Sequence, residues 1–378
     1  MEFLLPFTLT ILLIIILIIG ITFRITSREV WYSSLMAIVK SREAKIANRE
    51  ILRQALYKRS ILEALSTLAY TSIGSYLSKR VTEEVPYHTL ESMLWLAYAN
   101  DLQEIEGVLK GLPRKVYEAF IYRYDIYNIK SIVRSIVFKH HEVTLIPIGN
   151  LVKPESIERY KGIKSIGELV RELEARDYRD EAKLIRNYAK QMEVGDIEAI
   201  KSFERELMRY WYSRISSVVS EVDDPILIDT VKVLMDMDYI LSIIRLIHSK
   251  REELKGNIVT LEYIPTLLTL ECRRRLIEAK SVEEVLSILQ QTPYRGIVEE
   301  IVRGDFHRDP LLLDTALKTY FIKYILSTLL GDIFSLRPLV SYLLLKELEV
   351  HMLMFIFKVI SLNLPREGFE RVIHMYPL

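Results

Sequence analysis

The stretch that decides the fold is "DIYNIKSIVR", Asp125 to Arg134, because its pattern returns as "DMDYILSIIR", Asp236 to Arg245. The final arginines of the two copies lie 111 positions apart, and 113 positions further on is Lys358, at the end of "ELEVHMLMFIFK". In this third copy Glu349 takes the place of the two aspartates. Fixed spacing is the signature of a repeat architecture, so the sequence predicts three related units.

A second motif precedes each copy of the first. It reads "SILEALSTL" from Ser60, "SIGELVREL" from Ser165 and "SVEEVLSIL" from Ser281, at separations of 105 and 116 residues. Each begins with serine and has glutamate three residues later, which is a capping box that opens a helix. A period of about 112 residues exceeds the roughly 20 to 50 residues of solenoid repeats, so each unit should be a helical subdomain. Three such units most simply close around a pseudo-threefold axis, with a socket at its centre.

Composition favours long helices. The 378 residues are 50% apolar, and they include only 13 glycines and 12 prolines, so residues that break helices are sparse. Amphipathic helical spacing dominates, as in "REILRQALYKRSILEALSTLAY", whereas strand-type alternation is nowhere sustained. We therefore expect an all-α fold with a transmembrane helix at 1–24, followed by helical repeats at 25–144, 145–258 and 259–378.

Charge and motif content argue against several function classes. Lysine and arginine number 51 against 50 acidic residues, so no global field favours nucleic acid, and we expect no such partner. The single cysteine, Cys272, cannot form an internal disulfide or a Cys-based zinc site, which suits a reducing cytosol. The P-loop, dinucleotide, nucleophile-elbow and zincin motifs are absent, and adjacent His140 and His141 lack metal-ligand spacing. We expect no catalytic residue, cofactor or metal.

The N-terminal segment from Phe3 to Phe23 carries no charge over 21 positions. A helix of that length spans roughly 31 Å, which matches a hydrocarbon core of about 30 Å. Arg24 and Arg28 flank its far end, so the positive-inside tendency places the body on the cytoplasmic side of the cell membrane. We expect an anchor in contact with lipid. The alternatives are a cleaved signal peptide, which Glu2 as the only early charge disfavours, and a true start codon at Met36 or upstream of it.

Two longer patterns follow one another along the chain. "YDIYNIKSIVR" contains Asp-x-x-Asn-hydrophobic-Lys-x-hydrophobic-hydrophobic-Arg, formed by Asp125, Asn128, Lys130 and Arg134. "SVEEVLSILQQTPYRGIVEEI", from Ser281, begins with Ser-hydrophobic-x-Glu and runs into Thr-Pro-Tyr. Each pattern alone is typical of many helices, so their order and spacing carry the weight.

A third pattern and the opening helix complete the set. "RPLVSYLLLKELEVHMLMFIFK" contains Lys346, Glu347 and Glu349, and "WYSSLMAIVKSREAKI" begins at Trp31. Taken in order with the repeat, these stretches resemble the C subunit of archaeal A-type and bacterial V/A-type ATP synthases, called the d subunit in eukaryotic V-ATPases. The resemblance runs from about Trp31 to the C-terminus. Met352 stands where that family usually has asparagine.

The resemblance implies a funnel of three helical subdomains without an active site. Such a subunit sits on the cytoplasmic face of the membrane rotor ring, which is built of proteolipid subunits. It receives the foot of the central shaft, made of D/F-type subunits, in its socket. It thereby couples rotation to ion translocation through stiffness and two fitted interfaces. The N-terminal anchor departs from the family pattern, and we expect it either to enter the pore of the ring or to lie in bulk lipid.

The repeated polar positions are the candidates for contact with the shaft or the ring. They are Asp125, Asn128, Lys130, Arg134, Asp236, Arg245, Arg273, Arg274, Arg275, Lys346, Glu347 and Glu349. The repeated acid and arginine are nine residues apart and cannot pair on one helix, so they either grip the shaft or tie helices together. The basic run in "ECRRRLIEAK" is either a solvated helix face or a contact for an acidic partner or lipid head groups.

Two other classes of protein are weighed against the rotor subunit. A membrane-anchored adaptor built of helical repeats, outside any ATPase, has the same helical pattern. A membrane-anchored helical enzyme requires clustered titratable groups in a cleft, and no motif of that kind is visible in the sequence.

Overall fold

The computed structural model describes residues 29–83, 85–139, 143–249, 266–332 and 334–378, with four isolated positions before them. Every regular element in these residues is a helix, which confirms the all-α prediction for this part of the chain. No helix in the described part combines the length and the hydropathy that crossing a bilayer requires. The predicted anchor from Phe3 to Phe23 falls, isolated positions aside, outside the described residues, as do His140 and His141.

Residues 29–43 form the first helix, and three shorter helices followed by two long ones then recur along the chain. The shorter helices are α2 (Arg49–Leu56), α3 (Ile61–Thr67), α4 (Ser72–Ser78), α7 (Ile157–Lys161), α8 (Ile166–Ala175), α9 (Arg179–Glu193), α12 (Leu270–Glu278), α13 (Val282–Leu289), α14 (Arg295–Arg303) and α17 (Glu367–His374). The long helices are α5 (Tyr87–Glu106), α6 (Gly111–Phe138), α10 (Ile197–Ser220), α11 (Pro225–Ser249), α15 (Pro310–Thr328) and α16 (Arg337–Ser361). The 3-10 turns Pro154–Ser156 and Phe306–Arg308 precede α7 and α15.

The three predicted capping boxes open α3, α8 and α13. The hydroxyl of Ser60, Ser165 or Ser281 accepts from the backbone N–H three residues on, at 3.2 Å in each case. The glutamate at that third position accepts from the N–H of the residue before the serine, at 3.1, 2.9 and 2.7 Å. Each box therefore satisfies two backbone donors that a helix start leaves without partners.

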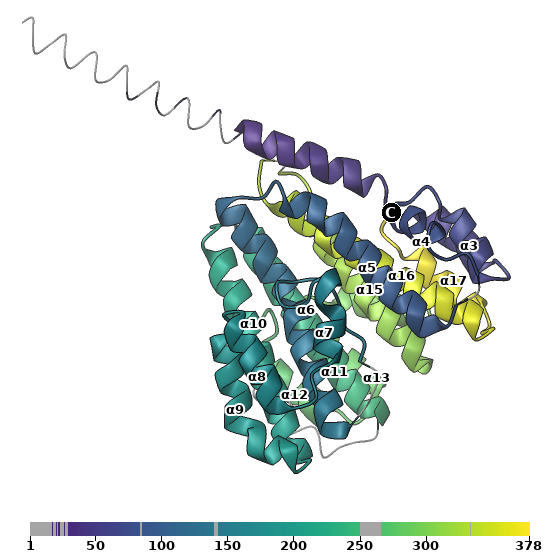
Figure 1. Cartoon of the computed structure of the whole chain (residues 1–378). Helices are drawn as coiled ribbons and strands as arrows, with labels where there is room; N and C mark the ends of the chain where they lie inside the picture. The colour runs from purple at the N-terminus through teal and green to yellow at the C-terminus, as the bar shows by residue number, and fades with distance from the viewer. Residues whose placement is uncertain are drawn as a thin grey trace, which may run out of the picture.

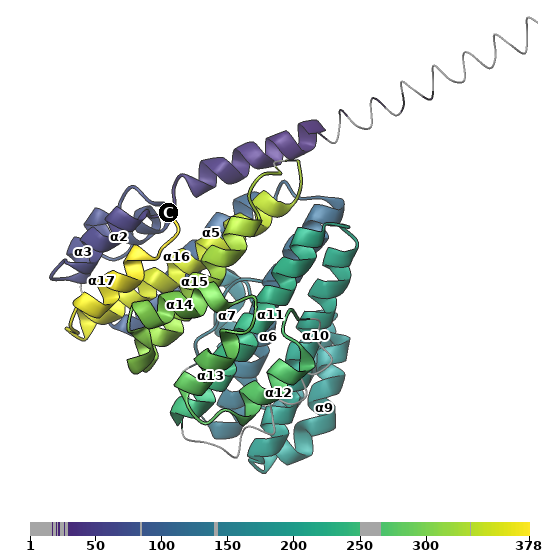
Figure 2. The same ribbon diagram turned by 180° about the vertical axis from the view of Figure 1, so that it is seen from behind.

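The three helices that carry Asp125, Asp236 and Glu349 each pack along a long helix from another part of the chain. α6 lies along α10, α11 along α15, and α16 along α5. Figure 1 shows α16 beside α5 and α6 beside α10, and Figure 2 shows the same neighbours from behind. The third pairing joins the last long helix to the first, so the order of contacts closes on itself.

The helices α6, α11 and α16 begin at the same end of the molecule. Lys115, near the start of α6, lies 3.0 Å from Glu221, which precedes α11. Asp224, also before α11, accepts two hydrogen bonds from Arg337 at the start of α16, at 2.8 and 3.0 Å. These contacts bring the starts of the three helices close together.

The C-terminal residues lie against the beginning of the chain. The backbone N–H of Arg49 donates to the carbonyl of Leu378 at 3.0 Å, and its guanidinium donates to the carbonyl of Tyr376 at 2.8 Å. Tyr376 is fully buried, and both views show the C-terminus next to the short helices α2 to α4. The expected division of the chain at 144/145 and 258/259 stays a prediction, and the second of these positions falls outside the described residues.

Candidate functional site

The repeated acid on α6 binds the segment that leads into the next short helices. Asp125 is buried, and its carboxylate accepts from the backbone N–H groups of Asn150 at 3.0 Å and Leu151 at 2.9 Å. The hydroxyl of Tyr178 donates to it at 2.6 Å. Asn128, one turn further along, makes two hydrogen bonds to the backbone of Ile146, at 2.7 and 2.8 Å. Both side chains therefore fix the connection between α6 and α7.

Asp236 repeats this arrangement on α11. It is fully buried and accepts from the N–H groups of Leu267 at 2.9 Å and Leu268 at 3.3 Å, and from the hydroxyl of Tyr294 at 2.6 Å. Burial raises the pKa of Asp236 to about 6, and the pKa of Asp125 to about 6 likewise, although their hydrogen bonds act in the opposite direction.

Glu349 completes the series on α16, but its partner is the start of the chain. Its carboxylate accepts from the backbone N–H of Ala47 at 2.7 Å, just before α2, and from the ammonium of Lys346 at 2.6 Å. Lys346 is fully buried and also contacts Asp101 at 2.7 Å and Ser72 at 2.6 Å. Burial lowers the pKa of Lys346, but the two carboxylates outweigh it and raise that pKa, so the lysine stays charged.

The repeated basic residues bridge the paired long helices. Arg134 donates two hydrogen bonds to Glu204 on α10, at 2.5 and 2.6 Å, and Lys130 lies 3.9 Å from the same carboxylate. Arg245 makes the equivalent pair with Asp314 on α15, at 2.7 and 3.1 Å. Two-pronged pairs of this kind fix the angle between helices as well as their distance. The structure therefore assigns these arginines to ties between helices, and their contact with a shaft stays a prediction.

A cluster of partly exposed charges connects α6, α15 and α16. Glu347 on α16 receives a hydrogen bond from Arg123 on α6, and it lies 3.6 Å from Lys318 on α15 and 3.5 Å from His351. The side chains keep 9% exposure for Glu347, 16% for Arg123, 20% for Lys318 and 32% for His351. Solvent therefore reaches a group of charges that three long helices hold in place.

Asp238 brings α11 into the same cluster. The hydroxyl of Tyr212 donates to its carboxylate at 3.2 Å, and Arg123 and Lys318 act on it electrostatically. Burial raises the pKa of Asp238 despite these two cations. Burial also acts to raise the pKa of Glu347, but Arg123 and Lys318 outweigh it and hold that pKa well below its usual range. We call Arg123, Asp238, Lys318, Glu347 and His351 the central cluster.

Sequence reasoning found only Glu347 among the members of the central cluster. A signal was present, because Asp238 and His351 follow the repeated acids of α11 and α16 by two positions, where α6 has Tyr127. Comparison of the three copies position by position exposes this polar variation. The contacts of Arg123 and Lys318 could not be found in this way, because they arise only when distant helices meet.

The comparisons with known proteins decide the family. The family model described as ATP synthase (C/AC39) subunit matches residues 35–371. The chain belongs to this family. As a member of it, the chain is a non-catalytic part of an ATP synthase.

Curated relatives of this family cover most of the chain. The C subunit of the A-type ATP synthase of Methanocaldococcus jannaschii is 23% identical over 341 residues, which are 86% of this chain and 82% of the relative. That of Thermococcus onnurineus is 23% identical over 363 residues, 92% of each chain. That of Desulfurococcus sp. is 24% identical over 352 residues, 89% of this chain and 90% of the relative. The family match, over residues 35–371, therefore includes all three repeated acids, Asp125, Asp236 and Glu349.

The residue three positions after each repeated acid differs in polarity between the three helices. Asn128 on α6 binds the backbone of Ile146, and Tyr239 at the equivalent position of α11 donates to the carbonyl of Arg273 at 2.9 Å. Met352, the equivalent residue of α16, is fully buried and apolar. The segment before α2 is therefore held without this second polar contact from α16.

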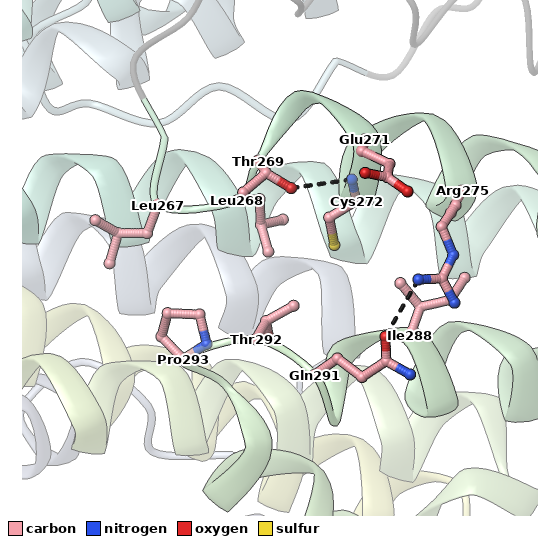
Figure 3. Close-up of a pocket in the computed structure, with 10 residues that line it drawn as sticks. All are labelled: Leu267, Leu268, Thr269, Glu271, Cys272, Arg275, Ile288, Gln291, Thr292 and Pro293. Atoms are coloured by element: carbon pink, nitrogen blue, oxygen red, sulfur yellow. Dashed lines mark hydrogen bonds between the residues drawn. The ribbon is translucent and has the colours of Figure 1, made fainter.

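The basic run of this C/AC39 family member lies on α12. Arg273 is buried, whereas Arg274 and Arg275 are exposed, and Arg275 donates to Gln291 at 3.2 Å. Figure 3 shows Arg275 and Cys272 on the wall of a pocket of about 280 Å³. Burial raises the pKa of the Cys272 thiol, so it is not activated as a nucleophile.

Metal binding has no support in the described part of this protein. No group of three or more histidine, cysteine, aspartate or glutamate side chains there is placed to hold a metal ion.

Proposed function

We propose that this chain is the central-stalk subunit of an A/V-type ATP synthase, and that its three repeats form a funnel around a pseudo-threefold axis. The observation that carries the proposal is the central cluster, in which helices from all three repeats present partly exposed charges to one region. The body caps the proteolipid rotor ring on its cytoplasmic side and receives the foot of the central shaft. Rotation of the shaft is thereby coupled to ion translocation.

The packing suits the transmission of torque. The pairs α6 with α10, α11 with α15 and α16 with α5 are joined to one another by contacts of α10 with α11, of α15 with α16 and of aromatic rings on α5 and α6. A twist on one helix is therefore resisted by all three pairs. The ties from Arg134 and Arg245 cross two of these pairs. A polar lining also lets the body hold a shaft without exposing a large apolar patch when it is free.

The predicted anchor from Phe3 to Phe23 extends this proposal to the membrane. A body centred over the ring places such a helix near the pore of the ring, where it would turn with the rotor. Extraction of membranes with alkaline carbonate tests the anchor on the full-length chain expressed alone. Retention in the pellet supports a spanning helix, and release into the wash contradicts it.

Affinity purification of the full-length chain from its native cells tests the rotor function. We expect the proteolipid ring, the shaft subunits and the nucleotide-binding subunits to co-purify after mild detergent extraction. Their absence, with the chain itself recovered folded, would sink the proposal and favour the adaptor outside any ATPase.

A further inference from the structure

The three repeats place different chemical groups at one equivalent position. Two residues after the buried acid stands Tyr127 on α6, Asp238 on α11 and His351 on α16. Each acid accepts from a backbone N–H group just before a set of short helices, which supports this equivalence independently of the sequence pattern. The three helices are therefore equivalent in position, whereas their side chains at this position differ in chemistry.

These three side chains are available to a partner to different degrees. Tyr127 is 43% exposed and the side chain of His351 is 32% exposed, while Asp238 is partly buried. One repeat thus offers an aromatic phenol, one a carboxylate and one an imidazole. A partner that contacts all three meets a different surface in each of three rotational settings.

The charges of the central cluster are also paired unevenly. Glu347 is surrounded by Arg123, Lys318 and His351. In the part of the chain that the structure describes, the carboxylate of Asp238 accepts one hydrogen bond, from the neutral hydroxyl of Tyr212. Arg123 and Lys318 act on this carboxylate electrostatically but donate no hydrogen bond to it. A partly buried carboxylate that accepts one hydrogen bond, from a neutral hydroxyl, gains from the direct contact of an added cation. Asp238 is therefore the group of the cluster best suited to a lysine or arginine of a partner.

We propose that Tyr127, Asp238 and His351 determine the rotational orientation of the shaft. Its foot then binds in one of three otherwise equivalent orientations, with a basic side chain of the shaft on Asp238. This inference rests on the proposed function, because it needs a shaft in the socket. A pseudo-threefold body with identical linings would accept the shaft in three settings, each a third of a turn apart. A unique setting keeps the angle between shaft and ring constant from one molecule to the next.

Distances between paired spin labels test the orientation. One label is placed off the axis near the foot of the purified shaft, and the other on full-length chain that carries Cys272→Ser. The second label goes in turn to Lys110→Cys, Glu221→Cys and Phe334→Cys, which are exposed residues 15 positions before each repeated acid. We expect one narrow distance at each site, different for the three sites. The same three-component distribution at every site would contradict a single orientation of the shaft.

The role of Asp238 is tested with Asp238→Asn, which keeps the shape and removes the charge. We expect the shaft still to bind, but with additional distances that account for about a third or more of the molecules, because a lost charge pair changes such preferences about tenfold or more. The matched control is Asp229→Asn, an exposed carboxylate on the same helix, which should keep the single distance. A single distance in Asp238→Asn would overturn the assignment of this residue.

The outcomes separate this inference from the function on which it rests. Failure of the labelled parent chain to bind the shaft, with a cooperative thermal unfolding transition preserved, contradicts the proposed function. Binding with three mixed orientations is consistent with that function and contradicts only the single orientation of the shaft.

Discussion

Lys346 connects the first and last parts of the chain through buried charges. It is fully buried, and its ammonium group neutralises Glu349 and Asp101 at 2.6 and 2.7 Å. Removal of one member of a buried charged group leaves the remaining charges buried without a partner. The resulting loss of folding free energy is larger than the stability that the intact group adds relative to apolar side chains. We therefore expect substitution of Lys346 to destabilise the fold, although Lys346 is not a member of the central cluster.

We expect Lys346→Met to lower the free energy of unfolding by about 3 to 5 kcal/mol, because two carboxylates then stay buried without a cation. Urea unfolding followed by circular dichroism measures the change. The matched control is Lys40→Met, since Lys40 is 54% exposed and pairs with Glu43 on its own helix. This control should lie within about 0.5 kcal/mol of the parent. Equal effects in the two variants would contradict the account of Lys346.

The buried aspartates give the chain a defined response to pH. Burial raises the pKa of Asp125 and of Asp236 to about 6, above the value near 4 that aspartate has in an unfolded chain. Between about pH 4 and pH 6 the folded chain therefore binds more protons than the unfolded chain. The stability that these two groups contribute is present at the low end of this window and is lost as the pH rises through it.

We expect Asp125→Asn to lose roughly half of this pH dependence, on the order of 2 to 3 kcal/mol between pH 4 and pH 6, because the amide does not titrate. The free energy of unfolding in urea at half-unit pH intervals measures it. Asp177→Asn is the control, since Asp177 is 82% exposed. Parallel curves for the parent and Asp125→Asn would show that Asp125 does not titrate in this range.

At the scale of single helices, the capping boxes are the feature that repeats most faithfully. Ser281 accepts from the N–H of Glu284, and Glu284 accepts from the N–H of Lys280. The same two bonds open α3 and α8. Each box sets where a shorter helix begins, and thereby which face it turns to the core.

We expect Ser281→Ala to lower the free energy of unfolding by about 1 kcal/mol, because the N–H of Glu284 loses its acceptor. Faster amide exchange at the start of α13 should accompany the change. Ser327→Ala provides the comparison, since Ser327 is exposed and donates only within its own helix, to Tyr324. An effect of the same size in both variants would contradict the role of the cap.

The helices and their starts could be predicted from the sequence because both depend on neighbouring residues. The capping boxes and the amphipathic spacing lie within about ten residues of one another, so the pattern itself contains the interaction. The pairs of Arg134 with Glu204 and of Arg245 with Asp314 connect residues 70 and 69 positions apart. The sequence predicts a tie between helices as one of two roles for these arginines, but it does not predict the partners, since helix pairing determines them.

The central cluster could be predicted least. Arg123 and Glu347 are 224 positions apart and have opposite charges at the equivalent position of two repeats, so a search for a repeated pattern passes over them. Lys318 lies on the neighbouring α15, outside the repeated motif. The repeat predicts where the helices run, whereas differences between the repeats produce the site.

For the molecule as a whole, the C-terminal residues hold the first short helices in place. Tyr376 is fully buried, and its carbonyl accepts from Arg49 at the start of α2. We expect Tyr376→Ala to lower the free energy of unfolding by about 3 to 5 kcal/mol, because a buried aromatic ring leaves a cavity. Amide exchange should accelerate in α2 and the segment before it, which lie at the opposite end of the sequence, and not in α8.

The control for this prediction is Tyr70→Ala, since Tyr70 is 92% exposed. Hydrogen exchange followed by mass spectrometry reports both regions in one experiment. Acceleration spread evenly over α2 and α8 would show a global loss of stability, and would contradict a local closure by the C-terminus.

The contact between Glu349 and Ala47 also determines when the protein can finish folding. The two residues are 302 positions apart, so at roughly 5 to 20 residues per second the ribosome needs about 15 to 60 seconds to supply the acceptor for an N–H that has already been made. Throughout that interval the apolar faces of α2, α3 and α4 lack α16, against which two of them pack. We therefore expect the newly made N-terminal part to expose apolar surface until the last long helix leaves the exit tunnel.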